Sequence, residues 1–249
     1  MSIEKWNIIL NISRQKSGGE RSFQNFPMEV DPDEYVLDAV ERVWAFHDRS
    51  LVYRHACHHS TCGACGMVVN GVEKLTCITP IRSVVGNGGT IKVEPLRNFP
   101  VLSDLTVDMG HFYRAMEDTG FYSVAPIAEA CLPYEKNRIK QEEMKYERLV
   151  DCIECGLCIS ACPAGATSSD YHGPAVMAAL HHCYIQNGDN RLLEMADSEN
   201  GVWRCHSAYE CTAVCPSFVD PAWRIMNLRR KVIAHRIMKI FSKEKEKVK

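Results

Sequence analysis

"CIECGLCISACP", residues 152–163, places four cysteines with two, two and three residues between them and ends on a proline. "CHSAYECTAVCP", residues 205–216, nearly repeats this pattern, but Ala208 stands where the second cysteine is due. In proteins with two iron–sulfur clusters, such spacing sends the first three cysteines of a motif to one cluster and the fourth to the other. The near-repeat therefore predicts a duplicated cluster-binding unit.

The missing cysteine predicts two clusters of different composition. The rule assigns four thiolates to a [4Fe–4S] cluster, from Cys152, Cys155, Cys158 and Cys215. It leaves three thiolates for the other cluster, from Cys162, Cys205 and Cys211. Three thiolates suit a [3Fe–4S] cluster, which lacks one corner iron and carries less total charge, a change that tends to raise the potential.

A separate cysteine group lies in "CHHSTCGACGMVVNGVEKLTC", where Cys57-x4-Cys62-x2-Cys65 is followed by Cys77. This is the plant-type spacing for a [2Fe–2S] cluster, and we expect Gly63 and Gly66 to let backbone N–H groups approach the sulfurs. Zinc is the alternative, but zinc sites usually show two C-x2-C pairs. A Rieske centre would use His58 and His59 in place of two cysteines, and four cysteines are already present.

Composition agrees with metal ligation by cysteine. The chain has 249 residues, 13 cysteines and a formal net charge of −2. Without a secretory signal or an apolar run of about 20 residues, we expect a soluble protein in a reducing compartment, where disulfides are disfavoured. Eleven cysteines fall in the three groups, and we expect the other two, Cys131 and Cys183, to be ordinary buried thiols.

The two halves of the chain differ in their secondary-structure signals, and together they predict an α+β protein. Residues 1–103 read as a small α+β domain, with strands at "WNIILNIS" and "TIKVEP", a hairpin at Asn70-Gly71 and a helix marked by the spacing of Val36, Val40, Val43 and Trp44. Residues 104–249 read as α-helical, from "MGHFYRAME", "KQEEMKYERLV", "GPAVMAALHHCYIQ" and "PAWRIMNLRRKVIAHRIMKIF". We expect Pro163 and Pro216 to stop the local helices.

Three cysteine groups in this order strongly resemble the iron–sulfur subunit of succinate dehydrogenase and fumarate reductase, respiratory complex II. The motifs include "FPVLSDLTVDM", "CIECGLCISACP" and "GVWRCHSAYECTAVCP", so the resemblance covers nearly the whole chain. It implies an N-terminal β-grasp ferredoxin domain and an α-helical domain like that of bacterial ferredoxins. It also implies a flavoprotein partner carrying FAD and the dicarboxylate site, so no catalytic acid or base is assigned to this chain.

The resemblance further implies a peripheral place at the membrane and a quinone as redox partner. Anchor subunits would hold the chain on the cytoplasmic face of the cell membrane or the matrix face of the mitochondrial inner membrane. Single electrons would pass between flavin and quinone through the [2Fe–2S], [4Fe–4S] and [3Fe–4S] clusters. The quinone-proximal residues would be Pro163, Thr167 and His206, although many succinate dehydrogenases have tryptophan near position 167.

Several alternatives stay open from sequence. His206 is equally well explained as a surface or structural histidine, and Trp203 and Trp223 are expected to pack. The basic C-terminal helix suits anionic lipid, an anchor subunit or a solvated end. Two other functions are possible from sequence. One is an electron-transfer protein that serves another flavoenzyme, such as a heterodisulfide-reductase-like system, and the other is a zinc-stabilised interaction protein.

Overall fold

The computed structural model describes residues 5–121 and 151–247, with side chains described up to residue 242. These residues divide into two compact units. The described residues up to Gly110, together with Ile153–Ala161, form the first unit. The described residues among His111–Cys152 and Cys162–Lys249 form the second.

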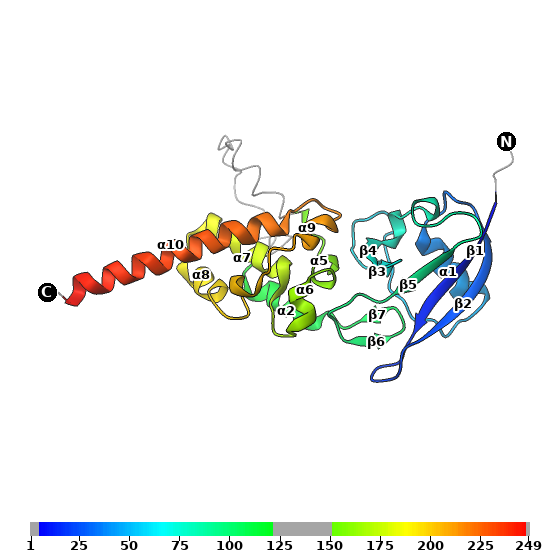
Figure 1. Ribbon diagram of the computed structural model, residues 1–249, viewed down its shortest axis with the longest axis horizontal. Coiled ribbons are helices and arrows are strands. Elements are labelled where there is room, and N and C mark those ends of the chain that lie inside the picture. The colour runs from blue at the N-terminus through cyan, green and yellow to red at the C-terminus, as the bar shows by residue number, and fades with distance from the viewer. Residues whose placement is uncertain (1–4, 122–150, 248–249) are drawn as a thin grey trace, which may run out of the picture. The chain divides into compact units, whose positions relative to one another are not determined.

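The first unit is built on a five-stranded mixed sheet in the order β2-β1-β5-β3-β4, and Figure 1 shows its strands and the helix α1. The strands are β1 (Trp6–Arg14), β2 (Ser22–Val30), β3 (Gly66–Val69), β4 (Val72–Leu75) and β5 (Thr90–Glu94). β1 and β5 run parallel, whereas β1 with β2, β3 with β4 and β3 with β5 run antiparallel. The strands expected at "WNIILNIS" and "TIKVEP" are confirmed.

Local sequence signals explain the other elements of this unit. Asn70 and Gly71 join β3 to β4 with φ of 49° and 86°, as a type I′ turn requires at both central positions. In helix α1 (Val36–Phe46), Val36, Val40 and Val43 are fully buried and pack with the sheet residues in one hydrophobic core, whereas Trp44 of the same pattern is 38% exposed. The predicted hairpin and helix are therefore confirmed, each from a short-range pattern.

Short elements complete the first unit. They are the 3₁₀ turns η1 (Thr76–Ile78) and η2 (Ile81–Ser83), the two-stranded sheet of β6 (Val101–Ser103) and β7 (Thr106–Val107), and helix α5 (Leu157–Ser160). β6 and β7 pair across the predicted domain boundary at 103/104, while the compact unit continues to Gly110. The boundary itself stays a prediction.

The second unit consists of helices around a buried centre. They are α2 (Gly110–Asp118), α6 (Pro163–Thr167), α7 (Gly173–Asn187), α8 (Asn190–Ala196), η4 (Val202–Arg204), α9 (Glu210–Ala213) and α10 (Pro221–Lys247). α7 is buried from Gly173 to Cys183, because α8 and α10 pack against it. α10 contributes Ile225, Leu228 and Val232, whose three- and four-residue spacing places them on one helix face.

The helices predicted at α2, α7 and α10 are confirmed, as is the buried thiol of Cys183, which is 5% exposed. The helix expected at "KQEEMKYERLV" and the thiol of Cys131 lie outside the described residues. Pro163 opens α6 at the first helical position, where its missing N–H has no consequence, so it starts a helix as well as following one. Within the described ranges, no helix is both long and apolar enough to cross a bilayer.

Candidate iron–sulfur sites

The loop from Cys57 to Cys65 turns its backbone amides toward sulfur. Cys57 Sγ accepts hydrogen bonds from the backbone N–H groups of Thr61 and Cys62 at 3.3 Å and of His59 at 3.5 Å. These bonds, with the one from His59 first, lower the pKa of the Cys57 thiol to about 6. Amides gathered around a sulfur stabilise its thiolate, the form that binds iron.

Cys65 and Cys77 close the same group from the strand side. Cys65 immediately precedes β3 and Cys77 lies in η1, and both are buried, at 3% and 2% exposed. Thr76 ties them together, because its N–H and hydroxyl both donate to Cys65 O, at 3.2 and 2.9 Å. Burial, followed by the neighbouring thiol of Cys65, raises the pKa of Cys77 to about 12. A buried thiolate therefore needs a cation, and cluster iron fits this donor set.

Gly63 lies where a second cysteine segment meets this loop. Its φ is +69°, and a Cβ placed on it would lie 2.8 Å from both Cys155 Cβ and Ile153 O. A Cβ on Gly66 would meet Leu157 at 3.2 Å and Cys155 O at 3.3 Å. From the sequence, these glycines are expected to let backbone N–H groups approach the cysteine sulfurs. The structure adds a different reason: the Cys155 segment packs directly on them.

Polar contacts that the sequence did not reveal hold Ile153–Ala161 on the first unit. Ser160 Oγ donates to the buried carboxylate of Glu73 at 2.8 Å and accepts from the backbone N–H of Arg97 at 2.8 Å. Asn98 Nδ2 donates to Ile159 O at 2.8 Å. Because Glu73 and Ser160 are 87 residues apart, no short-range pattern predicts their pairing.

A cavity in the second unit brings three of the predicted ligands together. Cys162, Cys205 and Cys211 all line it, and Ala208 lines it with them. The walls are almost entirely apolar, and the space between them that protein atoms do not fill, open solvent included, is about 330 Å³. The other lining residues are Pro163, Ala164, Tyr171, Pro174, His206, Ser207, Tyr209, Glu210, Ala222 and Ile225.

The electrostatics of this cavity suit an iron–sulfur cluster. Burial, and then the charges of Cys162 and Cys205, raise the pKa of Cys211 to about 12. Burial likewise raises the pKa of Cys162, against backbone hydrogen bonds from Gly165 and Ala164 that lower it. Three thiolates that repel one another in an apolar cavity are stable only when they share a cationic centre, so the donor set fits a cluster.

The cavity wall is braced from α10. Arg229 Nη2 donates to both Val202 O and Cys205 O at 2.7 Å, which fixes the backbone that carries Cys205. Ser207 has φ of 58° and Tyr209 has φ of 64°, so the loop on both sides of Ala208 is in the left-handed region. Arg229 was missed from sequence, because a helical arginine in a basic stretch gives no signal of its carbonyl partners.

Two of the three predicted quinone-proximal residues line the cavity, namely Pro163 and His206. Thr167 ends α6, and its hydroxyl donates to Ala164 O at 3.0 Å. Trp223 packs edge-on against His181, as expected of a packing residue. Trp203 is 39% exposed and donates to Asp197 Oδ1 at 2.6 Å, so its role is more polar than expected.

The four cysteines predicted to hold the [4Fe–4S] cluster come from both units. Cys155 and Cys158 belong to the first unit, in or beside α5, whereas Cys152 and Cys215 belong to the second. Cys215 Sγ accepts from Val219 N–H at 3.4 Å. Their assignment to one [4Fe–4S] cluster stays a prediction.

These features define an iron–sulfur protein with a [2Fe–2S] domain followed by a dicluster domain. Residues 9–114 match a family described as 2Fe-2S iron-sulfur cluster binding domain, and residues 148–219 match one described as 4Fe-4S dicluster domain. The chain belongs to the family of iron–sulfur subunits of fumarate reductase and succinate dehydrogenase. These are the electron-transfer subunits of their complexes.

Similarity to the relatives extends over most of both chains. The fumarate reductase iron–sulfur subunit of Haemophilus influenzae is 34% identical over 216 residues, covering 82% of this chain and 83% of the relative. The subunit of the same name from Mycobacterium tuberculosis is 30% identical over 238 residues, covering 94% and 96%. Among solved structures, the Mycobacterium smegmatis Sdh1 complex in the apo form matches with a TM-score of 0.80 at 26% identity, covering 94% and 98%.

Proposed function

We propose that the chain carries single electrons between the FAD of a flavoprotein subunit and a membrane quinone, as part of a succinate:quinone oxidoreductase or quinol:fumarate reductase. The observation that carries the finer assignment is the cavity lined by Cys162, Cys205 and Cys211, with Ala208 in the wall. Alanine offers no ligand, so this cavity suits the [3Fe–4S] cluster.

The other two clusters follow from the remaining ligand groups. Cys57, Cys62, Cys65 and Cys77 would hold the [2Fe–2S] cluster in an N-terminal domain of β-grasp type. Cys152, Cys155, Cys158 and Cys215 would hold the [4Fe–4S] cluster. When bound, the clusters accept and release one electron at a time.

The chain's own residues position and tune these centres. The amides of His59, Thr61 and Cys62 stabilise charge on Cys57 Sγ. Arg229 holds the carbonyl of Cys205, and the cavity around the three thiolates has almost entirely apolar walls. No residue of this chain is assigned a catalytic role, because the dicarboxylate chemistry takes place on the flavoprotein.

The quinone end is assigned to the neighbourhood of Pro163, Thr167 and His206. The presence of Pro163 and His206 in the wall of the three-cysteine cavity supports this assignment. The His206 imidazole is the group that would donate a hydrogen bond to a quinone oxygen or carry its proton.

Partners follow from the family. A FAD-containing flavoprotein and a membrane anchor would assemble with this chain and keep it peripheral, on the cytoplasmic face of the cell membrane or the mitochondrial matrix face. Side chains of α10 offer an apolar surface for such contacts, since Ile237, Met238, Ile240 and Phe241 are each 48–62% exposed.

EPR spectroscopy, metal analysis and copurification test the function. EPR spectra of the oxidised and reduced protein should show three distinct centres, and iron should approach about nine atoms per chain, from clusters of two, four and three irons. A colourless, EPR-silent protein with stoichiometric zinc would establish the zinc-stabilised alternative instead. If a flavoprotein copurifies but neither succinate nor fumarate is turned over, the chain is better explained as an electron-transfer protein for another flavoenzyme.

A further inference from the structure

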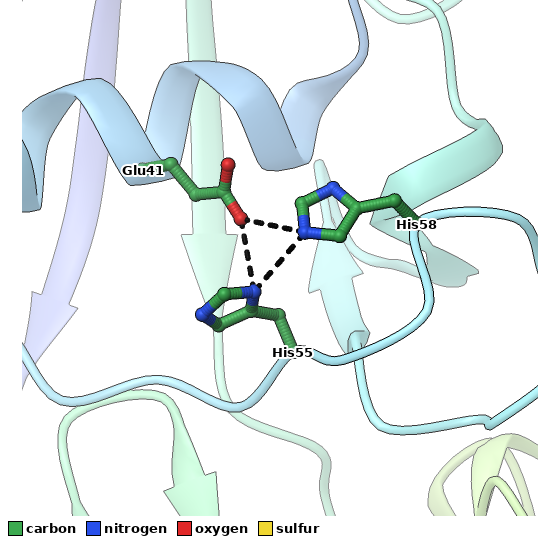
Figure 2. Close-up of side chains that lie close together, drawn as sticks. All are labelled: Glu41, His55 and His58. Atoms are coloured by element: carbon green, nitrogen blue, oxygen red, sulfur yellow. Dashed lines mark hydrogen bonds and ion pairs between the residues drawn. The ribbon is translucent and has the colours of Figure 1, made fainter.

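Three potential metal ligands other than cysteine meet on the first unit. Figure 2 shows Glu41, from α1, facing His55 and His58, from the loop around Cys57. Glu41 Oε1 lies 3.0 Å from His55 Nδ1 and 3.2 Å from His58 Nε2, and the two ring nitrogens are 3.2 Å apart. Three heteroatoms therefore form a nearly equilateral triangle.

The size of this triangle matches the face of a metal coordination sphere. Zinc binds imidazole nitrogen and carboxylate oxygen at roughly 2.0–2.2 Å. Neighbouring ligand atoms are then separated by about 2.9 Å in octahedral geometry and about 3.4 Å in tetrahedral geometry. The three observed separations, 3.0, 3.2 and 3.2 Å, fall inside this interval.

Hydrogen bonding alone does not satisfy the triangle. Each facing ring nitrogen carries at most one proton, and the carboxylate oxygen carries none. If both nitrogens donate to Glu41, the two N–H donors face each other. If one nitrogen is bare, it can accept the N–H of the other ring at 3.2 Å, but its lone pair then also faces the carboxylate oxygen. Glu41 Oε1 is a buried atom for which the described residues offer no hydrogen bond of acceptable geometry. A central cation would use all three lone pairs at once.

The ligands are oriented and still open to solvent. Tyr53 stacks on the His55 ring at 5.1 Å and 19°, and Trp44 packs edge-on against Tyr53. The side chains of His55 and His58 are 41% and 42% exposed, so an ion could enter and keep water as further ligands.

The geometry points to a further metal site on this chain, apart from the three clusters: Glu41, His55 and His58 bind one divalent first-row transition ion through two imidazole nitrogens and one carboxylate oxygen. This ligand set is the type found in catalytic zinc sites and in two-histidine, one-carboxylate iron sites. The site stands beside the [2Fe–2S] loop but uses none of its cysteines, and it does not depend on the proposed electron path.

Calorimetric titration with Zn²⁺ of the cluster-loaded full chain, under anaerobic conditions, tests the site. We expect one Zn²⁺ per chain, with affinity at least about tenfold lower in His55→Ala, His58→Ala and Glu41→Gln. His59→Ala is the matched control, because His59 belongs to the same loop and stands outside the triangle. The visible circular dichroism of the clusters verifies that each variant remains folded and loaded.

X-ray absorption at the zinc edge provides a second, independent measurement on the same samples. Nitrogen and oxygen neighbours at about 2.0–2.1 Å with imidazole scattering support the site. Sulfur in the first shell would show that zinc is taken by cysteines and would overturn the proposal. Equal Zn²⁺ affinity in the three variants and the control would overturn it as well, as would the absence of stoichiometric binding by the unmodified protein.

Discussion

Replacing Gly63 with alanine tests the contact between the two cysteine segments of the first unit. The added Cβ would lie 2.8 Å from Ile153 O and Cys155 Cβ and 2.9 Å from Cys155 Cα. Two of these three atoms belong to backbone, so no side-chain rotation relieves the overlap. The segment 153–161 must therefore shift, or the cluster loop must.

The expected destabilisation has two parts. A side chain at φ +69° costs about 1–2 kcal/mol in any L residue. Overpacking against atoms that cannot rotate away adds about 1–3 kcal/mol. Gly18 separates these parts, because its φ is +70° and nothing lies within 4 Å of a Cβ placed there. Gly18→Ala should show the backbone part alone.

The assay is thermal unfolding of the cluster-loaded chain, followed by loss of visible circular dichroism at one fixed heating rate. For a chain of this size, 1 kcal/mol lowers the melting temperature by about 2–4 °C. Gly63→Ala should therefore melt about 2–12 °C below Gly18→Ala. Equal melting temperatures would refute the close packing of the Cys155 segment on Gly63.

The remaining predictions concern the second unit. Ala208→Cys restores the complete cysteine spacing, so iron should rise by about one atom per chain and the oxidised [3Fe–4S] EPR signal should vanish; an unchanged spectrum in a folded variant would contradict the ligand assignment. Arg229→Met removes two charge-assisted hydrogen bonds, to Val202 O and Cys205 O, and should lower stability by about 1.5–3 kcal/mol for each bond. Arg230→Met loses one contact of 3.5 Å and serves as the control in the same melting assay. Burial lowers the pKa of His181 from 6.5 to about 3, so below pH 6.5 only the unfolded chain takes up this proton. Stability should fall as pH decreases from 6.5, by up to about 1.4 kcal/mol per unit from this group, and His181→Leu should flatten the profile; parallel profiles from pH 7.5 to 5.5 would disprove this role.

Features governed by neighbouring residues could be predicted from sequence. The Asn70-Gly71 turn follows from the need for positive φ, and helix α1 from the spacing of its valines. The cysteine groups were predictable for a similar reason: a cluster needs several thiolates from one loop, so its ligands leave a compact signature.

Features governed by distant residues could not be predicted. Nothing near Ser160 indicates that its hydroxyl reaches Glu73, and nothing near Glu41 indicates that two loop histidines converge on its carboxylate. The spacing of Gly63 fitted a cluster loop, yet its contact with Cys155 depends on how the chain returns after residue 150. Such contacts arise from tertiary packing, for which short-range periodicity carries no information.

The return of Ile153–Ala161 to the first unit has a consequence for biosynthesis. A nascent chain that has emerged only as far as Gly110 still lacks the hydroxyl that meets the Glu73 carboxylate. The ion pair between Glu73 and Arg97, at 3.5 Å, can form within this segment, but the buried hydrogen bond from Ser160 to Glu73 forms only after a later stretch of the polypeptide has emerged. A fragment cut at Gly110 would lack the Ser160 hydroxyl permanently, so severing the chain once does not release the first unit intact.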